Sequence, residues 1–155
     1  METIRFDDVE KLRSKVSAEY GPWSKPIEIP QSKINQFADV TGDHQWIHID
    51  VERCKRESPF GGPVAHGFLT LSLLPAFEHT AGWAVVGMRN VVNYGANKLR
   101  FISPVPAGAS VHARSRVVAV DPKPMGTQVT QETVIHVVGQ DRPAVIYEGI
   151  ALYVK

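Results

Sequence analysis

Two residues whose side chains can move a proton stand five positions apart in the stretch TGDHQWIHID. Asp43 and His48 follow a helix-like segment that should end at Gly42, so they are expected on irregular backbone. A carboxylate there can accept a proton from a bound water molecule while the imidazole orients the water or relays a proton. Each residue alone has a simpler explanation, as a turn aspartate or a structural histidine. The pair indicates acid–base chemistry beside a carbonyl group.

A third histidine, His66, precedes a glycine that opens a strongly apolar segment. The first amides of a helix at Gly67 would lack partners within the helix and would lie at its positive end, where a carbonyl oxygen gaining charge is stabilised. Glycine also lets a ligand approach the backbone closely, although helix entry alone explains it equally well. Ser72, the only polar residue between Leu71 and Phe77, either bonds back to its own helix or faces the site.

The histidines also raise the question of a metal site. His44 and His48 are four residues apart, and Asp43 and His66 could join them. No HExxH motif or other known ligand pattern is present, and the intervening Trp46 suits the wall of a site better than a ligand loop. The prediction is therefore a site without a metal.

The elements that must position these residues follow from the hydrophobic periodicity. The pattern predicts helices over residues 7–17, 33–40, 51–56 and 67–79, and strands over residues 26–29, 83–88, 90–95, 98–105, 110–120, 127–138 and 144–154. Ser32 is the expected N-cap of the second helix. The last helix is apolar on every side, which is typical of a buried helix, and Pro75 should kink it. Turns are expected at residues 104–108, 121–124 and 139–143.

One long buried helix followed by antiparallel strands indicates an α+β domain whose sheet wraps around the helix. Few charges interrupt the strand over residues 144–154, so two chains are expected to pair edge to edge as a homodimer.

Length and composition narrow the class of protein. A chain of 155 residues with 43% hydrophobic and 21% charged residues fits a single globular domain over residues 1–155. The net charge of +1 gives no reason to expect nucleic acid or an anionic membrane as a partner, and no apolar run reaches about 20 residues. The single cysteine, Cys54, cannot form an internal disulfide and is expected on an exposed helix face. These features favour a cytoplasmic protein.

At the residues singled out above, the sequence resembles the MaoC-like dehydratases, the (R)-specific enoyl-CoA hydratases. TGDHQWIHID followed by FGGPVAHGFLTLSL is similar to their hydratase signature, and VNYGANKLRFISPVPAGA is similar to the strand and turn after it. His44-Gln45-Trp46 resembles the branch with the nodulation protein N-like proteins. The resemblance implies the hot-dog fold, in which an antiparallel sheet wraps a long central helix, and homodimers formed by joining two sheets.

The resemblance also implies a set of site residues. Asp43 and His48 would be the catalytic pair, and the Gly67 amide would stabilise the charged carbonyl oxygen. The other expected substrate-binding residues are Ala65, His66, Ser72, Asn93, Tyr94, Gly95 and Lys98. The thioester carrier is expected beside residues 93–95, where glycine allows close approach and Lys98 offers charge to phosphates.

The reaction implied is hydration of a trans-2-enoyl-CoA, or dehydration of an (R)-3-hydroxyacyl thioester, with no cofactor beyond the CoA of the substrate. The expected partner is thus an acyl-CoA or acyl-carrier thioester. Two alternatives on the same fold remain open, a non-catalytic acyl-thioester-binding module and a hot-dog acyl-CoA thioesterase. The presence of both Asp43 and His48 favours the hydratase, because a binding module needs neither.

Overall fold

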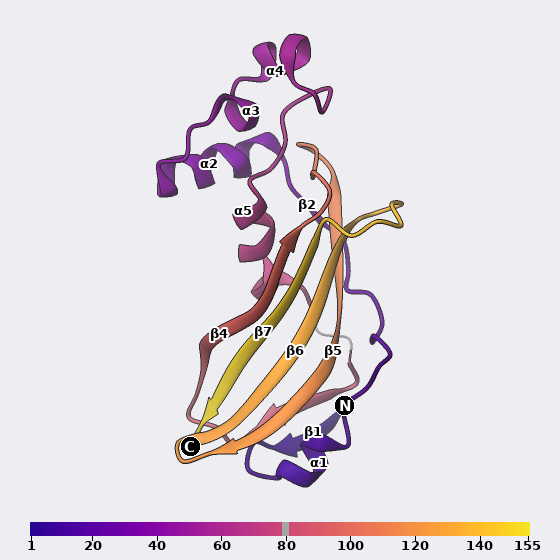
Figure 1. The fold of residues 1–155 in the computed structure, drawn as a ribbon, viewed down its shortest axis with the longest axis vertical. Coiled ribbons are helices and arrows are strands. Elements are labelled where there is room, and N and C mark those ends of the chain that lie inside the picture. The colour runs from indigo at the N-terminus through magenta and orange to yellow at the C-terminus, as the bar shows by residue number, and fades with distance from the viewer. Residues whose placement is uncertain (79–80) are drawn as a thin grey trace.

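A five-stranded antiparallel sheet forms the body of the protein and curls around a short helix (Figure 1). The computed structural model describes residues 1–78 and 81–155. In spatial order the strands are β2 (Ile27–Glu28), β5 (Ser110–Lys123), β6 (Gly126–Val137), β7 (Val145–Val154) and β4 (Asn90–Phe101). Every neighbouring pair is antiparallel. The predicted α+β class and its hot-dog arrangement are confirmed.

The core lies between the sheet and α5 (Gly67–Ser72). Successive strand residues point to opposite faces of a sheet, so Val111 and Ala113 of β5 share the inner face with Ile135 of β6. The buried cluster comprises Ile29, Ile34, Ala65, Leu69, Phe77, Val105, Val111, Ala113, Ile135, Val137, Ala144 and Val145.

Three helices gather beyond one end of the sheet (Figure 1). They are α2 (Gln31–Thr41), α3 (Trp46–Ile49) and α4 (Val51–Glu57). The expected C-cap of α2 is confirmed, because Gly42 has a φ of +78° and its amide donates to the Ala38 carbonyl. The expected N-cap is wrong. Pro30 occupies that position, and Ser32 lies within the first turn.

The helix expected over residues 67–79 is much shorter. It ends at Ser72 and is followed by a 3-10 turn, η1 (Leu74–Ala76), because Pro75 lacks the amide that would continue the α-helix. Nor is it buried on all sides, since Phe68 is 61% exposed. His79, the expected end of the helix, lies outside the described residues.

Two further helix predictions need correction. The helix expected over residues 7–17 shrinks to α1 (Val9–Arg13), which begins where the Asp8 side chain accepts a hydrogen bond from the Lys11 amide. Cys54 is fully buried rather than exposed, and its thiol donates to the Trp46 carbonyl at 3.3 Å. Burial raises the pKa of this thiol, so it is a packing residue and not a reactive one.

The strand predictions were correct in kind but not in every boundary. The segments expected over residues 90–95 and 98–105 form the single strand β4, which already ends at Phe101 and has irregularities between Asn93 and Gly95 and between Ala96 and Lys98. β5 runs on to Lys123 despite the expected turn. β1 (Glu2–Arg5), which was not predicted, pairs in parallel with β3 (Trp83–Val86) in a separate small sheet.

The free edge of the main sheet is β4, not the last strand. β7 is hydrogen-bonded on both sides, to β6 and to β4, so the prediction that residues 144–154 form the pairing edge was wrong. β4 is exposed along nearly its whole length, including Val91, Val92, Tyr94 and Phe101.

Among the described residues, no helix is long and apolar enough to cross a membrane.

Candidate active site

The end of α2 places the carboxylate of the predicted pair. Gly42 turns the chain out of the helix, and the Asp43 amide donates to the Thr41 hydroxyl at 3.3 Å. The Asp43 carboxylate accepts from the Gln45 amide at 3.3 Å and is 53% exposed. A proton acceptor open to a water molecule is therefore held by its own loop.

His48 lies in α3 with its imidazole buried. Its Nδ1 is 2.7 Å from the Val64 carbonyl, which can only accept, so Nδ1 carries the proton and Nε2 carries the lone pair. Desolvation by burial, together with the positive charge that His66 can carry, lowers the pKa of His48, against the opposing effects of the Val64 carbonyl and Asp43. His48 is therefore a neutral imidazole near pH 7 with one acceptor nitrogen.

His66 joins the two residues. Its Nε2 donates to the Asp43 backbone carbonyl at 3.0 Å and lies 3.9 Å from a carboxylate oxygen of the same residue. Its ring stacks on His48 with centroids 3.9 Å apart, and the Phe37 ring lies 5.0 Å away. Its Nδ1 is buried with no hydrogen-bond partner in the described part of the chain. His66 thus ties the Asp43 loop to the beginning of α5.

Asp43, His48 and His66 offer donor atoms that all lie within 4.8 Å of one another. Such a group could hold a metal ion by its donor types alone. His66 Nε2, however, already donates its hydrogen to the Asp43 carbonyl and has no lone pair there. His44, considered as a fourth ligand, instead pairs with Asp39 at 3.0 Å. The absence of a metal from the reaction stays a prediction.

Gly67 begins α5 directly after His66 of this cluster. Its amide donates no hydrogen bond to any described residue. A Cβ at this position would lie 2.7 Å from Cδ1 of Phe101, so the Phe101 ring would have to shift to admit any other residue. Glycine therefore lets this ring approach the start of α5 closely, and it also presents an unused amide.

Two of the remaining predicted site residues, Ala65 and Ser72, lie on either side of Gly67 in the sequence. Ala65 is buried next to His66, and its amide donates to the Val105 carbonyl at 2.8 Å. Ser72 is exposed and bonds back to the Phe68 carbonyl at 2.6 Å, the first of its two expected roles.

The expected carrier site lies elsewhere on the chain. Tyr94 stands seven residues before Phe101 on β4, a separation of roughly 20 Å along a strand. Lys98 is 3.9 Å from Glu132 and is not a free charge. Within one chain, residues 93–98 are not brought to the catalytic group.

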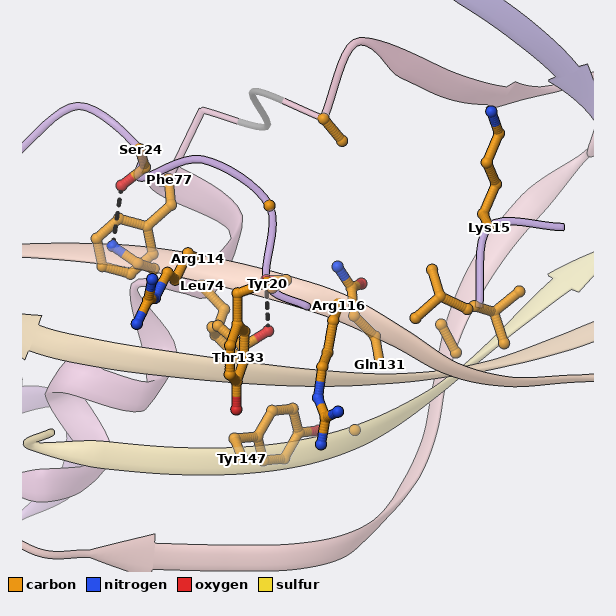
Figure 2. Close-up of a pocket in the computed structure, with 18 of the residues that line it drawn as sticks. Lys15, Tyr20, Ser24, Leu74, Phe77, Arg114, Arg116, Gln131, Thr133 and Tyr147 are labelled. Atoms are coloured by element: carbon orange, nitrogen blue, oxygen red, sulfur yellow. Dashed lines mark hydrogen bonds between the residues drawn. The ribbon is translucent and has the colours of Figure 1, made fainter. Parts of the chain in front are cut away.

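A cavity of about 700 Å³ opens on the inner face of the sheet beyond η1 (Figure 2). Leu74 and Phe77 wall it on one side, and Tyr147, Thr133 and Asn93 line the sheet side. Tyr20, Arg114 and Arg116 also line it, at the edge of β5 (Figure 2). The cavity does not include Asp43, His48 or His66, but the segment that starts at Gly67 leads toward it.

Sequence reasoning missed two contributors to this site, the Val64 carbonyl and the Phe101 ring. Nothing in the sequence marks the Val64 carbonyl, because every residue has a backbone carbonyl. The glycine at position 67 was the available signal for Phe101, since a glycine at a helix start indicates close approach by something.

Together the curled sheet, the short helix and the His–Asp cluster at its start define a hot-dog protein with an acid–base centre. Residues 15–139 match the model of the MaoC like domain family. The chain therefore belongs to the MaoC-like domain family, as the sequence signature predicted.

Two curated proteins have sequences similar to that of this chain. Over 150 residues the chain is 44% identical to 3-hydroxyacyl-thioester dehydratase Z of Mycobacterium tuberculosis, covering 96% of this chain and 97% of that protein. It is 47% identical over 114 residues to nodulation protein N of Rhizobium meliloti, covering 74% and 68%.

Solved structures agree on the fold. The (R)-hydratase from A. caviae, involved in PHA biosynthesis, superposes with a TM-score of 0.65 at 23% identity, covering 88% of this chain and 97% of that one. The monoamine oxidase regulatory protein from Archaeoglobus fulgius superposes with a TM-score of 0.72 at 25% identity, covering 90% and 92%. The predicted hot-dog class is thus found in both sequence and structure.

Proposed function

We propose that this chain is a lyase that hydrates trans-2-enoyl thioesters and, in reverse, dehydrates (R)-3-hydroxyacyl thioesters. The observation that carries the proposal is the neutral His48 with its acceptor nitrogen beside the exposed Asp43 carboxylate. The named activity of the mycobacterial relative is of the same kind.

The proposed reaction follows from which groups can accept a proton and which can donate a hydrogen bond. Asp43 accepts a proton from a water molecule as the water oxygen bonds to C3 of the enoyl group, and His48 Nε2 orients that water. Negative charge moves to the thioester oxygen, where the Gly67 amide donates to it. The protonated Asp43 then gives that proton to C2, which completes the addition of water and restores the carboxylate. The (R) configuration is taken from the relatives, because residue types alone do not select a face.

His66 acts in this scheme as a positioning residue. It holds the Asp43 backbone by a hydrogen bond and holds the His48 ring by stacking. No cofactor is needed beyond the carrier of the substrate, and a cytoplasmic location is part of the proposal.

The alternatives differ in their products. A thioesterase would also activate water, but it would release a free thiol. A binding module would leave the substrate unchanged, and it gives no reason for a tautomer-fixed imidazole beside a carboxylate. The test is crotonyl-CoA with purified protein. Loss of absorbance at the enoyl-thioester band without release of thiol supports the hydratase, and thiol release or no reaction contradicts it.

The pH dependence of this reaction should reflect the lowered pKa of His48. Because burial lowers that pKa below 6.5, His48 keeps its acceptor lone pair at pH 6.5. The acid limb of kcat/KM for crotonyl-CoA should therefore have its midpoint below pH 6.5. Stability should follow the same sign: the contribution of His48 is present above pH 6.5 and is lost as pH falls through the folded pKa, since the unfolded state binds the proton more readily. An acid limb centred at or above 6.5 would contradict the assigned role of His48.

We also propose that two chains pair through the free edge of β4. Unpaired backbone groups on an edge strand with exposed apolar side chains favour pairing with another strand. In an antiparallel pair, the first half of the partner's β4 would lie toward this chain's Phe101 and Gly67. Residues 93–95 would then approach the catalytic group from the second chain, which is how their predicted role could be met.

Sedimentation velocity at micromolar concentration should show a two-chain species for the wild type. Val92→Lys should shift the protein to a single chain, because it places a charge on the proposed interface. Val138→Lys is the matched control, since Val138 and Val92 are both 44% exposed but Val138 lies outside β4. A wild type that sediments as one chain would refute the pairing.

A further inference from the structure

The outer face of β5, away from α5, carries a row of cationic side chains. Val111 and Ala113 belong to the inner core, so the alternating residues His112, Arg114 and Arg116 face outward. The cross-strand partner of Arg116 is Glu132, and the two form an ion pair at 2.9 Å.

A segment between α1 and β2 runs along the edge of β5 beyond its short pairing with β2 and places aromatic rings in this row. The Gly21 and Ser24 amides bond to carbonyls of β5 at 2.9 and 2.7 Å. The Trp23 ring stacks on His112 with centroids 3.9 Å apart and an interplanar angle of 8°. The Tyr20 ring lies between the two arginines (Figure 2).

We call the series His112, Trp23, Arg114, Tyr20 and Arg116 the outer stack. Arg114 occupies its centre. Its Cζ lies 4.3 Å from the centroid of Trp23 and 5.1 Å from that of Tyr20. Two aromatic faces therefore hold one guanidinium plane, which fixes its orientation before any ligand arrives.

The two arginines of the stack differ in their hydrogen bonds. Arg116 is satisfied: Nε and Nη2 reach a carboxylate oxygen of Glu132 at 3.0 and 2.9 Å, and Nη1 donates to the Ala18 carbonyl at 2.9 Å. That same carboxylate oxygen also accepts from the Tyr20 hydroxyl at 2.6 Å. The hydrogen bonds from Tyr20 and Arg116 lower the pKa of Glu132, which is therefore ionised.

Arg114 has no such partner. Among the residues that the structure describes, it makes no ion pair and donates no hydrogen bond, and its Nε is buried without an acceptor. Buried donors are nearly always satisfied, and a guanidinium has five hydrogens to donate and no means of losing its charge. The side chain is only half-buried, so its free edge can be reached from solvent.

The nearby carboxylates have other partners. Glu132 pairs with Arg116 and lies 3.9 Å from Lys98, and Glu148 accepts from the Asn97 side chain at 2.9 Å. His112 carries no charge near pH 7, because burial and the nearby cations lower its pKa.

We propose that Arg114 is a binding site for an oxyanion, a phosphate or carboxylate group that accepts two parallel hydrogen bonds from the guanidinium fork. Planar bidentate recognition of this kind is the geometry for which arginine is suited, and the two rings have already oriented the fork. Tyr20, Arg114 and Arg116 also line the cavity described above, but that lining does not include Asp43, His48 or His66, so the proposal does not depend on the proposed hydratase function.

The test is a titration of the protein's tryptophan fluorescence, which includes Trp23, with inorganic phosphate and separately with acetate, with ionic strength held constant by chloride. Saturable binding of either anion is expected for the wild type. Arg114→Gln should weaken it at least about tenfold, because it removes charge-assisted hydrogen bonds. Arg114→Lys should weaken it by a similar factor, because an ammonium keeps the charge but lacks the fork. A preference for phosphate or for acetate identifies the source.

Arg100→Gln is the matched control, because Arg100 is an exposed arginine on β4 and should bind the anions as the wild type does. Thermal unfolding midpoints report whether each variant folds. The proposal is overturned if the wild type shows no saturable binding of either anion. It is also overturned if Arg114→Lys binds as well as the wild type, since charge alone would then account for the effect.

Discussion

Replacing Asp43 with asparagine should lower kcat for crotonyl-CoA hydration by about 10²–10⁴-fold, the usual contribution of a positioned general base. The amide keeps the shape of the carboxylate and can still accept a hydrogen bond from the Gln45 amide, but it cannot take a proton from water. KM should change little, because the lost interaction belongs to the transition state.

The fold should tolerate this change. The Asp43 side chain is 53% exposed, and His66 bonds to its backbone carbonyl rather than to its carboxylate. Asp39→Asn is the matched control, because Asp39 is an exposed aspartate in the same region that pairs only with His44. Should Asp43→Asn fold normally and keep the wild-type kcat, Asp43 is a turn residue and the proposed mechanism fails.

Replacing His48 with alanine should cause a loss of kcat of the same order, because the acceptor nitrogen that orients the water disappears. This variant also removes the bond to Val64 and the stack on His66, so some loss of stability is expected as well. His48→Gln separates the two effects: its amide can donate to Val64 as Nδ1 does, but it lacks the imidazole. Restored stability with kcat still low is the expected result, whereas a fully active His48→Gln would show that the imidazole has only a structural role.

The double variant Asp43→Asn with His48→Ala should lose little more activity than either single variant. Residues that hold one water molecule act as a unit, so the second substitution removes an interaction that is already broken. Single and double variants measured with crotonyl-CoA complete a double-mutant cycle. Fully additive losses in activation free energy would mean that the two residues act in separate steps.

The residue pattern was enough to predict which residues form the candidate site and where most strands of the sheet lie. Asp43 and His48 were predicted to lie together because a helix end and a short loop follow one another along the chain. His66 was singled out because it precedes a helix start, although hydrogen bonds from Val64 to Ile47 and from Ala65 to Val105 are what hold its segment in place. The strands β5, β6 and β7 were found because their residues alternate in character, which is a property of each strand alone.

Features that depend on contacts between distant parts of the chain could not be predicted from the sequence. α5 ends early, and β4 rather than β7 became the free edge, because strand order is set by which strands pair across the whole sheet. The burial of Cys54 and the tautomer of His48 depend on where other segments run. The outer stack also depends on distant parts of the chain, since Tyr20 and Arg114 are 94 residues apart. No local pattern predicts that the ring of a loop tyrosine will lie against the guanidinium group of an arginine on a strand. Bringing such distant residues together costs chain entropy. The contacts form because the packing of the whole chain stabilises them, and a local sequence pattern does not report that packing.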